Sequence, residues 1–268
     1  MSLWGTLLRR DGGASRKQSL LTLPTAAKIK SGKDTRMNHG LLARLLRNWT
    51  DHTSPGSAAA HFRHRRFSAF SSLVDRLPHP VRILDVGGDS RFWTTGAAAG
   101  MENIRVTVLN LQHQPGSTGS VPIIQADARQ LPFSQNHTFD VVYSNSVIEH
   151  VGSFPDQQRM AAEIQRVAKS YFIQTPSRWF PLEPHFLFPF FQFLPFSWRV
   201  WIASHYRGGW YCHPGDPEAA KKEVASIRLL TRRDCHRLFP GAKIRTERLF
   251  GLTKSYVILG GWCPTGLP

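Results

Sequence analysis

The feature that most constrains the fold is a regular alternation of short apolar runs and helical patterns that begins at residue 81. The apolar runs have the length of buried strands, and helical segments between strands are typical of crossovers in a parallel sheet. The predicted strands are 81–86, 104–111, 121–127, 139–146 and 170–176, the predicted helices are 91–100, 156–169 and 231–239, and an antiparallel hairpin closes the chain at 242–251 and 254–262. This pattern predicts an α/β fold with a doubly wound, seven-stranded, mostly parallel sheet.

Positive charge is dense at the start of the chain, where residues 1–60 carry ten Lys and Arg against three Asp and Glu. The whole chain has a formal net charge of +16, which favours nucleic acid, phosphorylated substrates or an acidic membrane surface as partners. An ordinary solvated surface is the alternative. Residues 1–36 are polar and contain glycine, so we interpret them as a disordered basic arm. A mitochondrial transit peptide or a start at Met37 would explain the same composition.

Helical periodicity fills the stretch between this arm and the first strand. The segment 38–49 places four leucines on one face and is predicted to be an amphipathic helix, packed on the main domain or resting on a membrane surface. A second helix over 58–77 ends at Pro78. The predicted division is therefore a basic arm (1–36), N-terminal helices (37–80) and one large domain (81–268).

One aromatic-rich and proline-rich segment, 179–202, interrupts the alternation within an insertion at 177–230. Its four prolines and the charged residues Glu183 and Arg199 exclude a membrane-spanning helix. Because the segment follows a strand end, it belongs on the side of the sheet where ligands bind. We predict a lid of short helices over a substrate pocket, with a core extension or a shallow membrane-contacting surface as alternatives.

Polar and glycine residues follow the successive strands, at the edge where such sheets bind ligands. Asp85 and the Gly87–Gly88 turn end the first strand, and glycine allows a ligand or another backbone to approach closely. Asn110 ends the second strand, where it can bind one hydroxyl group or simply form a turn. Asp127 follows the third strand, where a carboxylate can accept a hydrogen bond from an adenine amine.

The order of five blocks over residues 81–176 resembles class I S-adenosylmethionine-dependent methyltransferases, in particular the type 11 methyltransferase domain. The blocks read ILDVGG, VLNL, ADARQLPF, FDVVYSNSVIEHV and YFIQTP. The tail, 231–262, fits the last helix and the reversed hairpin of that Rossmann-like fold. The resemblance implies S-adenosylmethionine as cofactor, bound by residues at the strand ends: Asp85, Gly87, Gly88, Asp89, Asn110, Leu111, Asp127, Ala128, Asn145 and Ser146.

The cofactor-binding segments depart from the family's pattern at three residues. Asp89 and Arg91 stand where the family's loop usually has glycines, and Arg91 either covers the cofactor's carboxylate or simply begins a helix. Asn110 replaces the usual acid that binds the ribose, and it lacks a carboxylate's two strong acceptors. A cofactor-binding protein without catalysis is therefore one alternative.

Methyl transfer to an oxygen usually needs a base, and histidine is the first candidate because its pKa lies near neutrality. His150 follows the fourth strand, Glu149 beside it is a parallel candidate, and His185 with Glu183 in the lid is a third. Packing or capping is the alternative role for each of them. A carboxylate acceptor would need no base.

The sequence predicts no metal. Cys212–His213 and Cys235–His236 are adjacent pairs without the regular spacing of zinc ligands. Three cysteines make no disulfide framework, which favours a reducing, cytoplasmic setting, at a membrane periphery if the basic N-terminus contacts acidic lipid.

The predicted reaction is methylation of an O or N atom on a small-molecule, glycan-linked or lipid-linked acceptor. An RNA or protein acceptor is the alternative that the positive charge supports. Against nucleic acid, the fourth strand ends in SNSV rather than in the NPPY-like tetrad of base methylation, and no RNA-binding module is recognised.

Overall fold

The computed structural model describes residues 57–96, 98–112, 121–206 and 209–262. The predicted basic arm (1–36) and the predicted amphipathic helix (38–49) lie outside the described residues. In the described part, every helix falls short of the length and apolarity that crossing a membrane requires.

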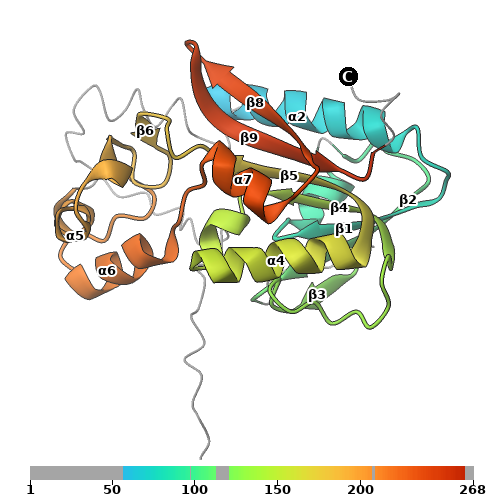
Figure 1. The fold of residues 1–268 in the computed structure, drawn as a ribbon, viewed down its shortest axis with the longest axis horizontal. Helices are drawn as coiled ribbons and strands as arrows, with labels where there is room; N and C mark the ends of the chain where they lie inside the picture. The colour runs from blue at the N-terminus through green and yellow to red at the C-terminus, as the bar shows by residue number, and fades with distance from the viewer. Residues whose placement is uncertain (1–56, 97, 113–120, 207–208, 263–268) are drawn as a thin grey trace, which may run out of the picture.

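A single seven-stranded sheet forms the centre of the molecule (Figure 1), with the strand order β3-β2-β1-β4-β5-β9-β8. The strands β1 to β5 pair in parallel, whereas β9 runs antiparallel to both β5 and β8. The strands are β1 (Val81–Val86), β2 (Ile104–Asn110), β3 (Ile123–Gln125), β4 (Phe139–Asn145), β5 (Ala168–Pro176), β8 (Lys243–Leu249) and β9 (Leu252–Gly260). The prediction of a doubly wound, mostly parallel sheet with a closing antiparallel hairpin is confirmed.

Helices cover both faces of this sheet. One face packs on α2 (Ala58–Val74) and α3 (Ser90–Thr94), and the other packs on α4 (Phe154–Val167) and α7 (Arg232–Leu238). Neighbouring residues of β1 therefore enter different cores: Ile83 packs with Phe70 of α2, and Leu84 packs with Ile164 of α4. Burial on both faces explains why this strand is apolar throughout instead of alternating with polar residues.

Capping residues set where the helices begin. Thr231 and Asp234 form the capping box that the sequence predicts for α7, and Ser153 and Asp156 form a second one at α4. The helix α4 begins two residues before the predicted position because Pro155 is accepted in a first turn. The predicted helix 91–100 is wrong in extent: α3 has five residues.

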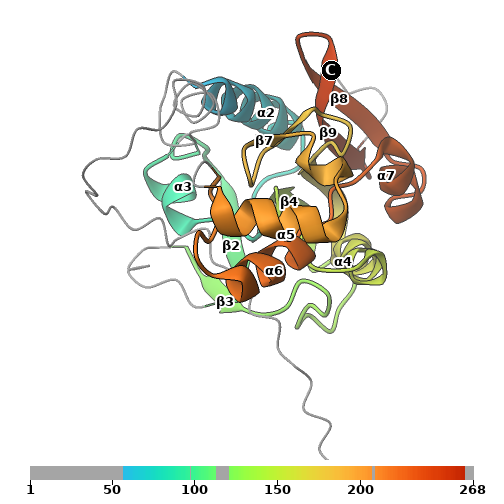
Figure 2. The ribbon, with the colours of Figure 1, turned by 90° about the vertical axis from the view of Figure 1, so that its left-hand side faces the viewer.

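The insertion at 177–230 forms a separate body beyond the carboxyl ends of the parallel strands (Figures 1 and 2). Its elements are β6 (Leu182–Glu183), β7 (Phe188–Pro189), the 3₁₀ helix η2 (Phe191–Phe193), α5 (Phe196–His205) and α6 (Pro217–Ser226). It has its own apolar cluster, built around Phe186, Phe191 and Ile202. The chain enters and leaves this lid at one place, because Ser177 forms a β-bridge with Leu230. The lid thus contains the predicted short helices, together with a two-stranded ribbon, β6–β7, that the sequence did not indicate.

Candidate functional site

The turn after β1 needs glycine at both of its positions. Gly87 has a φ of +79°, and a Cβ there would lie 2.4 Å from a methyl carbon of Val147. A Cβ on Gly88 would lie 1.7 Å from Oδ2 of Asp85, which accepts a hydrogen bond from Nε1 of Trp93 at 2.6 Å. Burial raises the pKa of this Asp85 carboxyl to about 7. The Asp85 side chain therefore lies directly beneath the turn and supports its path.

Asn110, at the end of β2, ties the next strand to the same turn. Its Nδ2 donates a hydrogen bond to the carbonyl oxygen of Gly88 at 2.8 Å. An aspartate in this position has no proton to donate and could not form that bond. The departure from the family's usual acid therefore has a structural role in holding the glycine turn.

Asp89 and Arg91, which replace family glycines, pair with each other. Arg91 donates to Asp89 through Nη2 at 2.7 Å and through its backbone N–H at 2.9 Å. The hydrogen bonds from Arg91 lower the pKa of Asp89. Asp89 is also the N-cap of α3, and Arg91 lies in the first turn of that helix. Both side chains are exposed, so this ion pair is screened by solvent.

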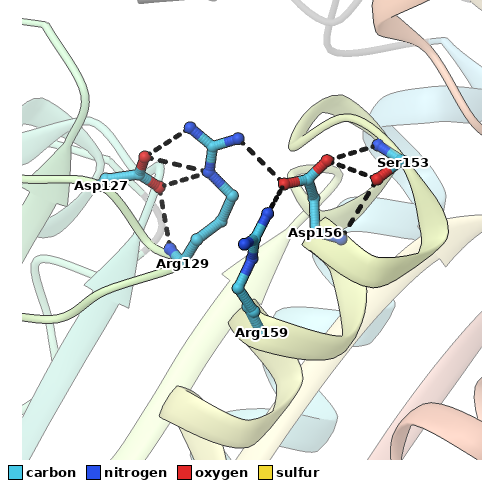
Figure 3. A network of polar contacts seen from close by, with 5 residues as sticks. All are labelled: Asp127, Arg129, Ser153, Asp156 and Arg159. Atoms are coloured by element: carbon cyan, nitrogen blue, oxygen red, sulfur yellow. Dashed lines mark hydrogen bonds and ion pairs between the residues drawn. The ribbon is translucent and has the colours of Figure 1, made fainter. Parts of the chain in front are cut away.

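The same arrangement recurs after β3 (Figure 3). Arg129 donates to Asp127 through Nη2 at 2.6 Å and through its backbone N–H at 2.9 Å, and it reaches on to Asp156 at 3.1 Å. Burial would raise the pKa of Asp127, but the bonds from Arg129 outweigh it and lower this pKa. Asp156 in turn caps α4, so Arg129 joins the end of β3 to the start of that helix.

The end of β4 contains a buried acceptor without a donor. Oδ1 of Asn145 has no hydrogen-bond partner among the described residues, whereas Oγ of Ser146 donates to Gln174 at 2.9 Å. Leaving a buried acceptor unpaired costs about 1–3 kcal/mol, so a bound donor would stabilise it. S-adenosylmethionine carries amine and hydroxyl donors, and the unpaired Oδ1 together with the glycine turn fits such a group.

The predicted cofactor residues thus gather along one edge of the sheet. They follow β3, β2, β1 and β4, which lie side by side in that order. Leu111 and Ala128 are partly buried next to Asn110 and Asp127. Direct contact of these residues with a cofactor stays a prediction.

The three predicted catalytic candidates lie in one cluster at the junction of the sheet and the lid. Nε2 of His150, in the 3₁₀ helix η1 (Ile148–His150), lies 3.1 Å from Nε2 of His185. Nδ1 of His185 lies 2.6 Å from Oε1 of Glu183. The ring of Tyr211 stacks on His150 with a centroid distance of 5.7 Å. A hydrogen-bonded chain therefore joins Glu183, His185 and His150.

Glu149 lies beside this chain and is fully buried. Its Oε2 accepts a hydrogen bond from Oγ1 of Thr175 at 3.0 Å, but its Oε1 has no partner among the described residues. Burial raises the pKa of this carboxyl to about 7, which exceeds the lowering effect of nearby His185. Glu149 is therefore a carboxyl group poised to change its charge near neutral pH.

The two histidines differ in their affinity for a proton. Loss of solvent around the ring lowers the pKa of His150 well below its usual value, and the charge of His185 lowers it further. Burial would also lower the pKa of His185, but the attraction of Glu183 and Glu149 outweighs it and raises this pKa. A proton taken up by the pair therefore resides on His185.

The same cluster has the residue types of a metal site. Ligand atoms of Glu149, His150 and His185 all lie within 4.8 Å of one another. The prediction of no metal was drawn from spacing along the chain, which could not reveal this set. The cysteine of the Cys235–His236 pair is fully buried in the sheet core.

A cavity of about 480 Å³ adjoins the cluster on its lid side. Glu183 lines this cavity and also bonds His185, so one side chain connects the two. Its wall also includes aromatic and cationic side chains: Phe186, Phe191, Phe196, Arg178, Arg199 and Arg228. Sequence reasoning did not single out Tyr211 or Thr175, which are separated along the chain from the residues they contact.

Comparison with known proteins agrees with this architecture. Residues 96–171 match the family model described as a methyltransferase domain. A curated relative, 2-methyl-6-phytyl-1,4-hydroquinone methyltransferase 1, chloroplastic, from Oryza sativa subsp. japonica, is 35% identical over 98 residues. The match covers 34% of this chain and 28% of the rice protein, so the chain corresponds to under a third of that relative.

Two solved methyltransferase structures show a distant likeness. The 1,6-didemethyltoxoflavin-N1-methyltransferase of Burkholderia thailandensis, with 1,6-didemethyltoxoflavin and S-adenosylhomocysteine bound, is 14% identical, with a TM-score of 0.45 over 84% of this chain and 90% of that one. A methyltransferase dependent on S-adenosylmethionine from Aquifex aeolicus is 12% identical, with a TM-score of 0.42 over 72% and 87%. The predicted resemblance to class I methyltransferases and their cofactor, S-adenosylmethionine, is confirmed by the domain match and the strand order.

Proposed function

Because the chain carries a class I methyltransferase domain, we propose that it transfers a methyl group from S-adenosylmethionine to an oxygen or nitrogen of a small-molecule, glycan-linked or lipid-linked acceptor. The observation that carries this proposal is the chain of hydrogen bonds from Glu183 through His185 to His150. It provides a buried proton acceptor at the end of β4, beside the edge where the predicted cofactor residues gather.

The strand ends would hold the cofactor. S-adenosylmethionine, when bound, supplies a methyl group activated by its positively charged sulfur. The Gly87–Gly88 turn presents backbone without side chains, and Asn145 offers the unpaired acceptor Oδ1. Asn110 and Asp127 are fixed at the neighbouring strand ends by their bonds to Gly88 and Arg129. The protein's part in this reaction is to position the reactants and exclude water.

The histidine pair would take the proton that an acceptor loses. Glu183 accepts the Nδ1 proton of His185, so Nε2 of neutral His185 can accept a hydrogen bond from Nε2 of His150. Nδ1 of His150 then has a free lone pair and accepts the proton of the acceptor. The Nε2 proton of His150 moves across to His185, where Glu183 stabilises the positive charge. This direction agrees with the raised pKa of His185 and the lowered pKa of His150.

The acceptor would enter between the lid and the sheet. The lid cavity beside Glu183 has apolar walls and cationic groups, which suits an amphipathic small molecule. The rice relative is named for a phytyl-substituted hydroquinone, which supports a small-molecule acceptor with a hydroxyl group.

The test combines binding with turnover. Calorimetry should show binding of both S-adenosylmethionine and S-adenosylhomocysteine, and transfer of a labelled methyl group to a panel of hydroxylated aromatic, glycan and lipid acceptors should identify the acceptor class. Binding of neither compound would contradict the proposal, and transfer to RNA or protein alone would replace the acceptor class. Turnover in EDTA should be unchanged. A loss of turnover would mean that Glu149, His150 and His185 hold a metal ion instead of a proton.

A further inference from the structure

Exposed aromatic side chains are concentrated on the lid. Nine large apolar side chains are exposed in the described part of the chain, and six of them lie between residues 179 and 201. These six form what we name the aromatic patch: Trp179, Phe190, Phe193, Phe196, Trp198 and Trp201. Each of the three tryptophans is more than 60% exposed. Such a concentration on one segment marks an interaction surface.

Two groups of patch residues are each held in place by the fold. Trp179 stacks on Phe193 with a centroid distance of 5.7 Å, and Nε2 of Gln192 donates to the carbonyl oxygens at both ends of the 178–180 stretch. Trp198 and Trp201 lie three residues apart on α5, whose opposite side buries Ala203. Figures 1 and 2 place α5 on the outer side of the lid, away from the sheet. The patch therefore comprises the Trp179–Phe193 pair and the exposed tryptophans of α5, which lies on the outer side of the lid.

Two arginines border this patch and make no ion pair within the described residues. Arg178 and Arg199 both line the lid cavity, and Nε of Arg199 is buried without a hydrogen-bond partner there. Burial lowers the pKa of Arg199, and the positive charge of Arg178 lowers it further, so a nearby anion would be favourable. Arg228 in the same cavity differs, because it pairs with Asp234 at 3.5 Å.

Acidic residues are nearly absent from the segment that contains the aromatic patch. Glu183 is the one acidic residue between 178 and 205, and it is 2% exposed and bonded to His185. The surface therefore combines exposed aromatic rings with unpaired positive charge. Tryptophan and phenylalanine partition into the boundary of a bilayer, and arginine forks match phosphate oxygens.

We propose that the aromatic patch docks on an anionic lipid bilayer, with Arg178 and Arg199 binding lipid phosphate. A second copy of the chain is a poorer occupant, because a two-fold contact would bring the same arginines toward each other. Arg178, Phe196 and Arg199 also line the lid cavity, so the proposed lipid contact adjoins the space proposed for the acceptor. The vesicle measurement needs no acceptor and tests the lipid contact separately. It also assigns membrane contact to the lid, apart from any contribution of the basic N-terminus.

The experiment is sedimentation of the full chain with vesicles. One set contains phosphatidylcholine with about a third phosphatidylglycerol, and the other contains phosphatidylcholine alone. We expect binding to the anionic vesicles, and the double variant Trp198→Ser/Trp201→Ser should bind at least about tenfold more weakly. The matched control is Phe250→Ser/Leu252→Ser, which removes two exposed apolar side chains from the β8–β9 turn, and it should bind as the unmodified chain does. Equal unfolding midpoints would show that both variants are folded.

Three results would overturn the proposal. These are no binding of the unmodified chain to anionic vesicles, unchanged binding of the tryptophan variant, and an equal loss in the control. A stable dimer that the tryptophan variant dissolves would identify the second copy as the occupant instead. Replacing both Arg178 and Arg199 by Gln should reduce the preference for anionic over neutral vesicles, and an unchanged preference would contradict the assignment of phosphate to these arginines.

Discussion

The strand-end edge and the histidine cluster use charge in opposite ways. At the edge, Asp89 and Asp127 pair with arginines two residues along the chain, and these pairs remain partly or largely exposed. In the cluster, His150 and Glu149 meet residues of the lid and of β5 that lie at least 26 positions away, and they are largely enclosed. Local pairing in solvent keeps a carboxylate charged, whereas enclosure raises the pKa of Glu149 and lowers that of His150.

This difference separates two tasks. At the edge, Asp89 and Asp127 keep a fixed negative charge beside a fixed turn, which suits binding a cofactor. The cluster contains groups that can gain or lose a proton near neutral pH, which suits chemistry. Substitutions in the two regions should therefore affect different measurements, and the following predictions run from the largest effect to the smallest.

Replacing His150 by Ala should have the largest effect, and it should lower turnover without weakening cofactor binding. Turnover should fall about 10²–10⁴-fold, because the variant loses the group that accepts the proton, while the dissociation constant of S-adenosylmethionine should change by less than about twofold. Single-turnover rates and calorimetry measure the two quantities. His236→Ala, an exposed histidine on α7, is the control. An equal loss of cofactor binding in His150→Ala would show a structural role instead.

Replacing Gly88 by Ala should disturb the turn after β1, at the strand-end edge of the sheet. The new Cβ would meet the Asp85 carboxylate, so Asp85 or the turn must shift, and the free energy of unfolding should fall by about 1–3 kcal/mol. Binding of S-adenosylmethionine should weaken at the same time. Denaturant unfolding and calorimetry test this. Gly100→Ala is the matched control, since nothing lies within 4 Å of its Cβ position. A similar loss of stability in that variant would show that the contact with Asp85 is not the cause.

The pH dependence of turnover should follow the cluster. A raised pKa of His185 means that the pair is already protonated at low pH, so turnover should fall as the pH decreases through a value above 6.5. Glu183→Gln removes a charge that raises this pKa, so the midpoint should move to lower pH. A full pH profile of turnover for both proteins provides the measurement. An unmoved midpoint would show that Glu183 does not govern the titration.

Arg91→Ala should have the smallest effect. Arg91 is exposed and pairs with Asp89, so its removal should change the dissociation constant of S-adenosylmethionine by no more than about twofold. Calorimetry at two salt concentrations measures this. A loss of tenfold or more would mean that Arg91 leaves Asp89 and binds the carboxylate of the cofactor.

Elements with strong local signals were predictable from the sequence. The apolar run 81–86 and the capping box at Thr231 specify their elements almost alone, and both were confirmed. The two-residue strands β6 and β7 were not predictable, because so short a ladder leaves no periodicity and one of its residues is a proline. The helix α3 stops early because the N–H groups of Thr95 and Gly96 both bond the carbonyl oxygen of Arg91, which closes the last turn.

The candidate site was predictable as a set of residues but not as a cluster. His150 and His185 were each suggested by residue type and by position after a strand or in the lid. Their 3.1 Å contact depends on the path of the lid, which no local pattern encodes. The bond from Asn110 to Gly88 likewise joins residues 22 positions apart, so the sequence reveals the missing acid but not what the amide does.

The bridge between Ser177 and Leu230 has a consequence for how such a chain changes over generations. Because the two ends of the lid are adjacent, the whole of it can be exchanged, shortened or grafted without cutting a strand of the sheet. Such an exchange would carry away His185, Glu183 and the aromatic patch together, and it would leave the turn at Gly87 and Gly88 in place. The adjacent ends of the lid would therefore allow the proposed acceptor cavity, two of the three residues in the hydrogen-bonded chain and the aromatic patch to be exchanged as one unit.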